Sequence, residues 1–272
     1  MTQRSRTAGD LLRLWRQRRR HSQLSLALHA DVSARHLSFI ETGRARPSRE
    51  MLLGLAERLE IPLRDRNVLL LAAGYAPEFR ETRLDDPALR AARDAVTMVL
   101  GALEPYPALA VDRQWTIVAS NRATAPLLEG AAPELLRPPV NALRLSLHPH
   151  ELAPRIVNLA EWRRHILERL RRDVEISGDG ALVALEQERR SYGDSDRPDE
   201  EPTTAWAHGD VVVPLRVRTP RGVLSFASTT TVFGTAVDVT LAELAIEAFL
   251  PADRETAELL GAAHLAAGAP AR

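Results

Sequence analysis

Two short helical patterns near the start of the chain are joined by only three residues, 31 to 33. Ser22 is placed to cap a helix over residues 23–30, and Ser33 is placed to cap the next helix, which Gly43 ends. So short a link holds two helices at a steep angle, which is the helix-turn-helix arrangement. The spacing therefore constrains the fold of the N-terminal third.

The turn and the underside of this unit also follow from the residue types. The turn position usually takes Gly because φ tends to be positive there, and Asp31 is one of the few other residues that tolerates the left-handed region. Apolar residues at helical spacing predict three more helices. The first contains Trp15, the fourth opens at Pro47 and Ser48, and the fifth spans residues 64–73. We expect an all-α domain of five helices.

Charge is divided unevenly along the chain. The whole sequence carries 36 basic and 36 acidic residues, but residues 1–83 hold 16 Arg against 9 acidic residues, whereas residues 84–272 hold 20 against 27. Such asymmetry indicates one part that binds a polyanion and one part with another task. All basic residues are Arg, which together with the Ala-rich composition is typical of a GC-rich bacterial coding bias, so Arg content alone does not indicate phosphate binding.

Two absences exclude several classes of protein. The sequence has no Cys, which excludes disulfides, thiolate metal sites and a thiol nucleophile, and fits a reducing compartment. No apolar run approaches the length of about 18 residues that a membrane span needs. We expect a cytoplasmic protein that does not contact membranes.

The stretch SQLSLALHADVSARHLSFIETGRARPS resembles the lambda-repressor-like helix-turn-helix of the xenobiotic-response-element regulators, over about residues 8 to 75. The resemblance implies that the third helix enters the major groove of double-stranded DNA, where Arg35 can contact guanine with two hydrogen bonds. Gln23 would contact a DNA phosphate, and the loop beyond the third helix would contact the sugar-phosphate backbone of the DNA. The implied DNA-binding residues are Gln23, Ser33, Ala34, Arg35, Ser38, Phe39, Arg44 and Arg46. A solvated arginine face is the alternative, but it does not explain why the outward face of this helix carries Arg, His and Ser.

The sequence pattern of the C-terminal two thirds of the chain predicts a second domain. Residues 76–87 are polar and bounded by prolines, so we expect a DNA-binding domain over residues 1–80 and a second domain over residues 81–272. The pattern predicts a helix over 88–103, two strands around a turn at 112–114, and a helix from Asn121.

Later segments complete this domain. Residues 151–190 are helical in pattern with an interruption at 177–180, and the acidic segment 190–204 is expected to be a mobile loop. From Val211 the period changes to two, which predicts a three-stranded antiparallel meander up to residue 250. The expected fold class is α+β multidomain: the five-helix domain followed by a PAS-like sensor domain with a five-stranded antiparallel sheet.

Several segments together resemble the MmyB-like transcription regulators, among them DLLRLWRQRRR, SARHLSFIETGRARPSREM, PYPALAVDRQWTIVASN and ELAIEAFLPAD. The resemblance covers nearly the whole chain. It implies a bacterial transcription regulator, in which a helix-turn-helix is fused to a PAS-like ligand-binding domain whose cavity can hold a fatty-acid-like molecule. No cofactor is required, and the expected partners are double-stranded DNA and a small apolar ligand.

A pocket for such a ligand needs an apolar wall and a polar group near its mouth. The candidate ligand-binding residues are Leu103, Trp115, Ile117, Leu143, Arg144, Leu147, Ile166, Leu170, Phe226 and Phe233. His148 and Arg163 are further candidates for the polar end. Ordinary core packing is the more common explanation of each apolar member, because an apolar face at strand or helix spacing needs no ligand.

Two other functions stay open at this point. His148, His150 and Glu151, with His208 elsewhere, suggest a zinc hydrolase, but the spacing is not the helical i, i+4 pair and Pro149 disfavours a helix there. An antitoxin-like module that grips a partner protein is the second alternative. The sequence favours a regulator without enzymatic activity. We expect a homodimer, because helix-turn-helix units usually pair across two half-sites.

Overall fold

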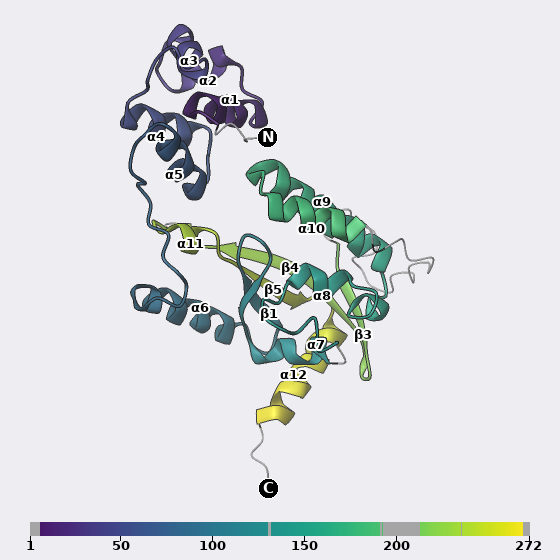
Figure 1. Cartoon of the computed structure of the whole chain (residues 1–272). Coiled ribbons are helices and arrows are strands. Elements are labelled where there is room, and N and C mark those ends of the chain that lie inside the picture. Colours follow the sequence, from purple (N-terminus) through teal and green to yellow (C-terminus); the bar gives the residue numbers. More distant parts are fainter. Residues whose placement is uncertain (1–5, 130–131, 191, 193–212, 235, 269–272) are drawn as a thin grey trace. The chain divides into compact units, whose positions relative to one another are not determined.

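The computed structural model describes residues 6–129, 132–190, 192, 213–234 and 236–268 (Figure 1). The chain divides into two compact units. The first comprises residues 1–83, 175–177 and 235–242, and the second comprises residues 84–174, 178–234 and 243–272.

Five helices build the main part of the first unit, as the sequence predicts. They are α1 (Ala8–Arg18), α2 (Gln23–His29), α3 (Ala34–Glu41), α4 (Arg49–Arg58) and α5 (Leu63–Ala72). In α2, α3 and α4 the predicted serine caps are present: the hydroxyls of Ser22, Ser33 and Ser48 each accept a hydrogen bond from the backbone N–H three residues on. Each such cap contributes about 1 kcal/mol.

Tight packing fixes the position of α3 in this unit. Leu12, Leu37 and Ile40 belong to one buried apolar cluster that α1 to α5 share. A Cβ on Gly9 of α1 would lie 2.3 Å from the Ile40 carbonyl oxygen, so the two helices approach more closely than any other residue type would allow. In the turn between α2 and α3, Asp31 has a φ of 54°, which confirms the left-handed conformation expected there.

The second unit is built on a five-stranded antiparallel sheet, which confirms the expected fold class. The strands are β1 (Ala108–Val111), β2 (Ile117–Ser120), β3 (Leu215–Thr219), β4 (Gly222–Val232) and β5 (Ala245–Pro251). Their order across the sheet is β2-β1-β5-β4-β3. The N-terminal hairpin therefore joins the C-terminal meander through the β1–β5 pair, in which Ala108 lies opposite Ala248.

Helices cover both faces of this sheet. The helices of this part of the chain are α6 (Arg90–Ala102), α7 (Ala125–Leu128), α8 (Ala142–Leu147), α9 (Leu159–Ser177), α10 (Gly180–Arg190) and α12 (Arg254–Gly268). Residues of α8, α9 and α10 share a buried cluster with β1, β3 and β4. On the sheet, α12 packs against β4 and β5, and α6 packs against β1 and β2. The interruption expected at 177–180 is present, because Gly178 ends α9 with a φ of 65°.

Three sequence predictions in this region need correction or lie partly outside the described residues. The segment expected to form one strand from residue 239 begins instead with a short helix, α11 (Val239–Ala242), and β5 starts only at Ala245. Asp238 explains the helical turn, since its carboxylate accepts a hydrogen bond from the Thr240 N–H at 2.9 Å. Of the strand expected from Val211, the described part begins at residue 213, and β3 starts at Leu215. Most of the expected loop at 190–204 lies outside the described residues.

Candidate DNA-binding face and ligand cavity

The outward face of α3 combines a fixed backbone with accessible side chains. Leu37 and Ile40 are buried on its inner side, while Arg35 is exposed and Phe39 is half-buried. The Arg35 guanidinium lies over the Phe39 ring, with 5.4 Å between its central carbon and the ring centroid. Such stacking restricts an otherwise flexible arginine and leaves its hydrogen-bond donors available.

Gln23 takes part in a network beneath this face. Its side-chain amide donates to Glu41 Oε2 at 2.8 Å, and Glu41 also accepts two hydrogen bonds from Arg16. Only the part of Gln23 not engaged with Glu41 is left to meet a phosphate. The network ties the start of α2 to the end of α3.

The two arginines of the following loop have different environments. Arg44 is exposed, and its backbone N–H is bonded to the Phe39 carbonyl oxygen at 2.7 Å, so the loop folds directly back onto α3. Arg46 donates to the Ala73 carbonyl oxygen at 3.1 Å and lies over the Tyr75 ring. Arg46 thus supports the C-terminal end of α5, a structural role that the sequence pattern did not reveal.

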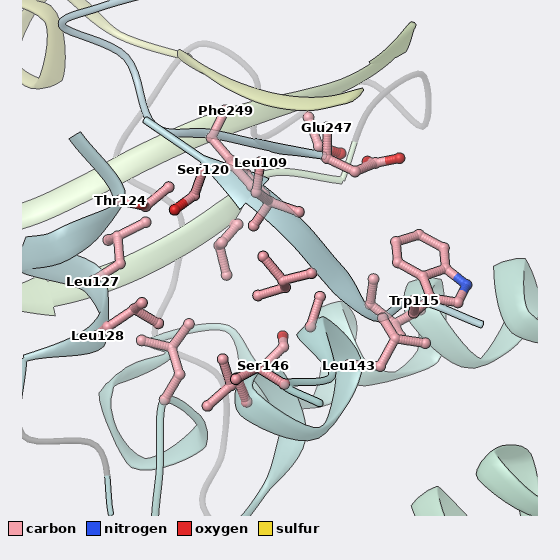
Figure 2. A pocket seen from close by; sticks show the side chains of 18 of the residues that line it. Leu109, Trp115, Ser120, Thr124, Leu127, Leu128, Leu143, Ser146, Glu247 and Phe249 are labelled. Carbon is pink, nitrogen blue, oxygen red and sulfur yellow. The ribbon is translucent and has the colours of Figure 1, made fainter. Parts of the chain in front are cut away.

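A cavity of about 310 Å³ lies in the second unit, between its sheet and the segment that carries α7, α8 and α9. Its wall is mostly leucine, isoleucine and aromatic side chains (Figure 2). Figure 2 places Trp115 and Glu247 on one side and Leu127 and Leu128 on the other. A volume of this size falls at the lower end of the range of about 300–1,000 Å³ that is typical of ligand pockets.

The structure brings some of the predicted pocket residues to this wall and leaves others elsewhere. Trp115, Ile117, Leu143 and Ile166 line the cavity. The other six candidates do not lie on its wall: Leu103, Arg144, Leu147, Leu170, Phe226 and Phe233. Leu147, Leu170 and Phe226 are fully buried in the apolar cluster because their faces of the helix or strand point into the packed core. Arg144 is paired with Glu188, and neither His148 nor Arg163 lines the cavity.

The polar end of the cavity is formed by residues that the sequence analysis missed. Arg169 of α9 donates to both carboxylate oxygens of Glu247 on β5, at 3.0 Å and 2.6 Å, and its guanidinium lies 4.5 Å from the Trp115 ring centroid. One signal could have revealed Glu247: it alternates with Ala245 and Phe249 on the same face of β5, so a charged residue occupies an apolar face. Its partner, 78 residues away, could not be inferred from spacing.

Trp115 itself is held in an unusual backbone conformation. Its φ is 65°, and the preceding turn is closed by Asp112, whose carboxylate accepts hydrogen bonds from the N–H groups of Gln114 and Thr116. The indole N–H donates to Asp173 at 3.3 Å, and burial raises the pKa of that carboxyl group above its ordinary value. Asp112 therefore shapes the turn that presents Trp115 to the cavity.

Two buried polar residues of the second unit, Asn121 and Glu151, bond to the backbone. Asn121 is buried, accepts from the Ala108 N–H and donates to the carbonyl oxygens of Leu100 and Tyr106, so it joins α6 to the strands. Glu151 accepts from the Ala132 N–H. Within the part of the chain that the structure describes, no group of three or more His, Asp or Glu side chains could hold a metal ion. His208 lies outside that part. None of the described helices is long and apolar enough to cross a membrane.

Known families match both units. The MmyB-like transcription regulator ligand binding domain matches residues 92–263, and a helix-turn-helix family matches residues 12–65. The chain therefore belongs to the MmyB-like transcription regulators. It combines a DNA-binding helix-turn-helix with a ligand-binding domain, and both matched families are regulatory.

More distant comparisons add little. No curated protein matches the chain. The solved structure of an RNA-binding light-oxygen-voltage receptor is 15% identical, with a TM-score of 0.27 over 96% of this chain. The chain spans 64% of the length of that protein.

Proposed function

We propose that this protein is a sequence-specific, DNA-binding transcription regulator of the cytoplasm whose affinity for its operator responds to a fatty-acid-like molecule in the cavity. The observation that carries the proposal is the coexistence of two features. One is the accessible Arg35–Phe39 face of a capped α3, and the other is a largely apolar cavity inside a separate unit. No cofactor is needed for either.

On DNA, α3 lies in the major groove with Arg35 on a guanine, while Ser38 and Phe39 face neighbouring base edges. Ser33 and Ala34, at the start of the helix, contact the adjacent phosphate, and Arg44 contacts the backbone without reading sequence. Gln23 and Arg46 act mainly by holding this surface in place, since both already bond within the unit. The active species is a homodimer, with one helix-turn-helix on each half-site.

In the cavity, an alkyl chain packs against the leucine-rich wall with its polar end toward Arg169 and Glu247. Occupancy alters the relative placement of the two DNA-binding units in the dimer. A coupling of about 1–3 kcal/mol between the two sites is ordinary for such regulators and changes operator affinity by a factor of about 5–150.

The test is to select binding sequences from a randomised duplex library with the purified full chain. The selected duplex is then titrated at several salt concentrations, with and without extracted small molecules. We expect log affinity to fall linearly with log salt, with a slope of about −0.9 for each neutralised phosphate, and the affinity to change when the cavity is filled. Failure to enrich any sequence at low salt would contradict the DNA-binding part, and equal affinities with a filled and an emptied cavity would contradict the sensor part.

A further inference from the structure

The polar end of the cavity is an ion pair in which Arg169 and Glu247 already bond to each other. Arg169 Nη1 donates to Glu247 Oε2 at 3.0 Å, and Arg169 Nη2 donates to Glu247 Oε1 at 2.6 Å. The Thr230 hydroxyl lies between the same two groups, since it accepts from Arg169 at 2.8 Å and donates to Glu247 Oε1 at 3.0 Å. The Glu247 side chain is only 4% exposed, so this charge has little access to water.

The cavity wall is electrically balanced. Among the residues that line it, all of which the structure describes, Arg169 is the one basic residue and Glu247 is the one acidic residue. The other polar side chains on the wall are hydroxyls: Ser120, Thr124, Ser146 and Ser228. Both charges of the wall are therefore paired with each other, and neither is left over to bind the polar end of a ligand.

We propose that the cavity selects an elongated apolar molecule whose polar end is an uncharged hydrogen-bond donor such as a hydroxyl group, and that it discriminates against the carboxylate of a free fatty acid. The inference rests on the proposed sensor function and names the chemistry of its ligand. It narrows the fatty-acid-like class to molecules with a neutral end.

The charge of the ligand's end group determines how well it fits beside this ion pair. A carboxylate could bind Arg169 only by displacing Glu247, which would leave a buried negative charge without its partner, or by lying beside Glu247 with the same sign of charge. An ammonium group could bind Glu247 only by displacing Arg169 or by lying beside Arg169 with the same sign of charge. Because no spare countercharge is present, either ion would also exchange its hydration for the neutral hydroxyl groups of the wall alone, which compensate only part of that loss.

A hydroxyl group meets neither obstacle. Among the described residues, Arg169 is the one donor to Glu247 Oε2, and a carboxylate oxygen can accept two hydrogen bonds. A ligand O–H can therefore donate to Oε2 while the ion pair stays intact. The end group is satisfied and the alkyl chain remains against the leucine-rich wall.

The experiment uses three probes with the same alkyl chain: dodecanol, dodecanoate and dodecylamine. Each is titrated into the purified full chain by calorimetry, with the two ions kept below their micelle concentrations and dodecanol below its solubility limit. We expect dodecanol to bind at least about tenfold more tightly than either ion, which corresponds to about 1.4 kcal/mol. Tighter or equal binding of dodecanoate or dodecylamine overturns the inference while leaving the sensor function in place. If none of the three binds, the proposed sensor function fails, and this inference fails with it.

A charge-removing variant gives a second, independent readout. Glu247→Gln keeps an acceptor for Arg169 but leaves the guanidinium without a countercharge, so dodecanoate should gain at least about tenfold in affinity. Dodecanol loses the charged acceptor of its O–H and should not bind more tightly than it binds the unmodified protein. Glu258→Gln is the matched control, because it makes the same change at an exposed glutamate on α12 outside the cavity. An unchanged affinity for dodecanoate in a folded Glu247→Gln variant overturns the inference. If that variant does not fold, the three probes on the unmodified protein decide alone.

Discussion

The Arg16 guanidinium and the Glu41 carboxylate join α1 to α3 through two hydrogen bonds, 2.6 Å from Nε to Oε1 and 2.8 Å from Nη2 to Oε2. Their side chains are 10% and 1% exposed. Arg16 also donates to the His21 carbonyl oxygen at 2.8 Å, just before α2 begins. One ion pair thus connects the three helices that position the DNA-binding face.

Removal of one partner of this pair should be costly. Glu41→Ala leaves the Arg16 charge buried and uncompensated, so we expect α3 to lose about 3–5 kcal/mol of stability. The measurement is the free energy of opening of the α3 amides, obtained by hydrogen exchange in the full chain. The double variant Arg16→Met with Glu41→Leu removes both charges and should recover most of the loss. A loss below about 1 kcal/mol in Glu41→Ala would show that the pair does not stabilise the unit.

Arg35 and Arg44 should affect DNA binding in different ways. Arg35→Ala removes a base contact, so we expect a loss of about 1–3 kcal/mol on the selected sequence and little on unrelated duplexes. Arg44→Ala removes a phosphate contact, so binding should weaken on all sequences and the salt slope should shrink by about 0.9. The measurement is fluorescence anisotropy on both kinds of duplex across a salt series. Arg58→Ala, an exposed arginine on α4, is the control for lost charge alone. Identical profiles for Arg35→Ala and Arg44→Ala would refute this assignment of roles.

The helical unit was predictable because its determinants are local. Ser22, Ser33 and Ser48 cap helices within three residues of themselves, and Asp31 adopts a positive φ through its own side-chain chemistry. The strands of the second unit were also predictable as elements, since alternation is a local signal. Their order was not, because the β1–β5 pairing joins residues more than a hundred positions apart.

The cavity was harder to predict for the same reason. Trp115 and Ile166 stand out as large apolar residues, but whether such a residue faces a cavity or a filled core depends on how distant elements pack. Leu170 shows the difference, since it follows the cavity-lining Arg169 directly and is fully buried. The Arg169–Glu247 pair at the polar end arises only when α9 crosses β5, and no spacing rule anticipates it.

His165 should make the second unit sensitive to acid. Burial lowers the pKa of this imidazole below 6.5, and the charges of Arg169 and Arg172 lower it further, against the opposing effect of Glu168 and Glu161. Between its folded pKa and 6.5, the unfolded chain binds a proton that the folded chain does not, so stability falls as the pH drops through this window. The ring lies 5.5 Å from that of Trp162 on the cavity wall.

The measurement is the melting temperature at about pH 7.5 and at about pH 5.5. His165→Gln cannot take up the proton, so we expect it to lose less stability on acidification than the unmodified protein. His264→Gln makes the same change at an exposed histidine of α12 and is the control for the substitution itself. Parallel pH profiles for His165→Gln and the unmodified protein would mean that this imidazole does not couple folding to pH.

Ala142→Leu should separate ligand binding from stability. Ala142 lines the cavity at the start of α8, and its backbone N–H bonds to the Trp115 carbonyl oxygen at 2.9 Å, so a larger side chain there extends into the open space without disturbing that bond. Each added methylene that becomes buried contributes about 0.8 kcal/mol, so the unliganded variant should be at least as stable as the unmodified protein. The cavity, in contrast, has less volume left for the ligand, and we expect the affinity for the ligand to fall at least about tenfold.

The rise in melting temperature on adding ligand measures this loss of affinity, because that rise depends on the ratio of ligand concentration to Kd. Ala181→Leu adds the same atoms to an exposed position on α10 and should leave the rise unchanged. A full ligand-induced rise in Ala142→Leu would place the ligand outside this cavity.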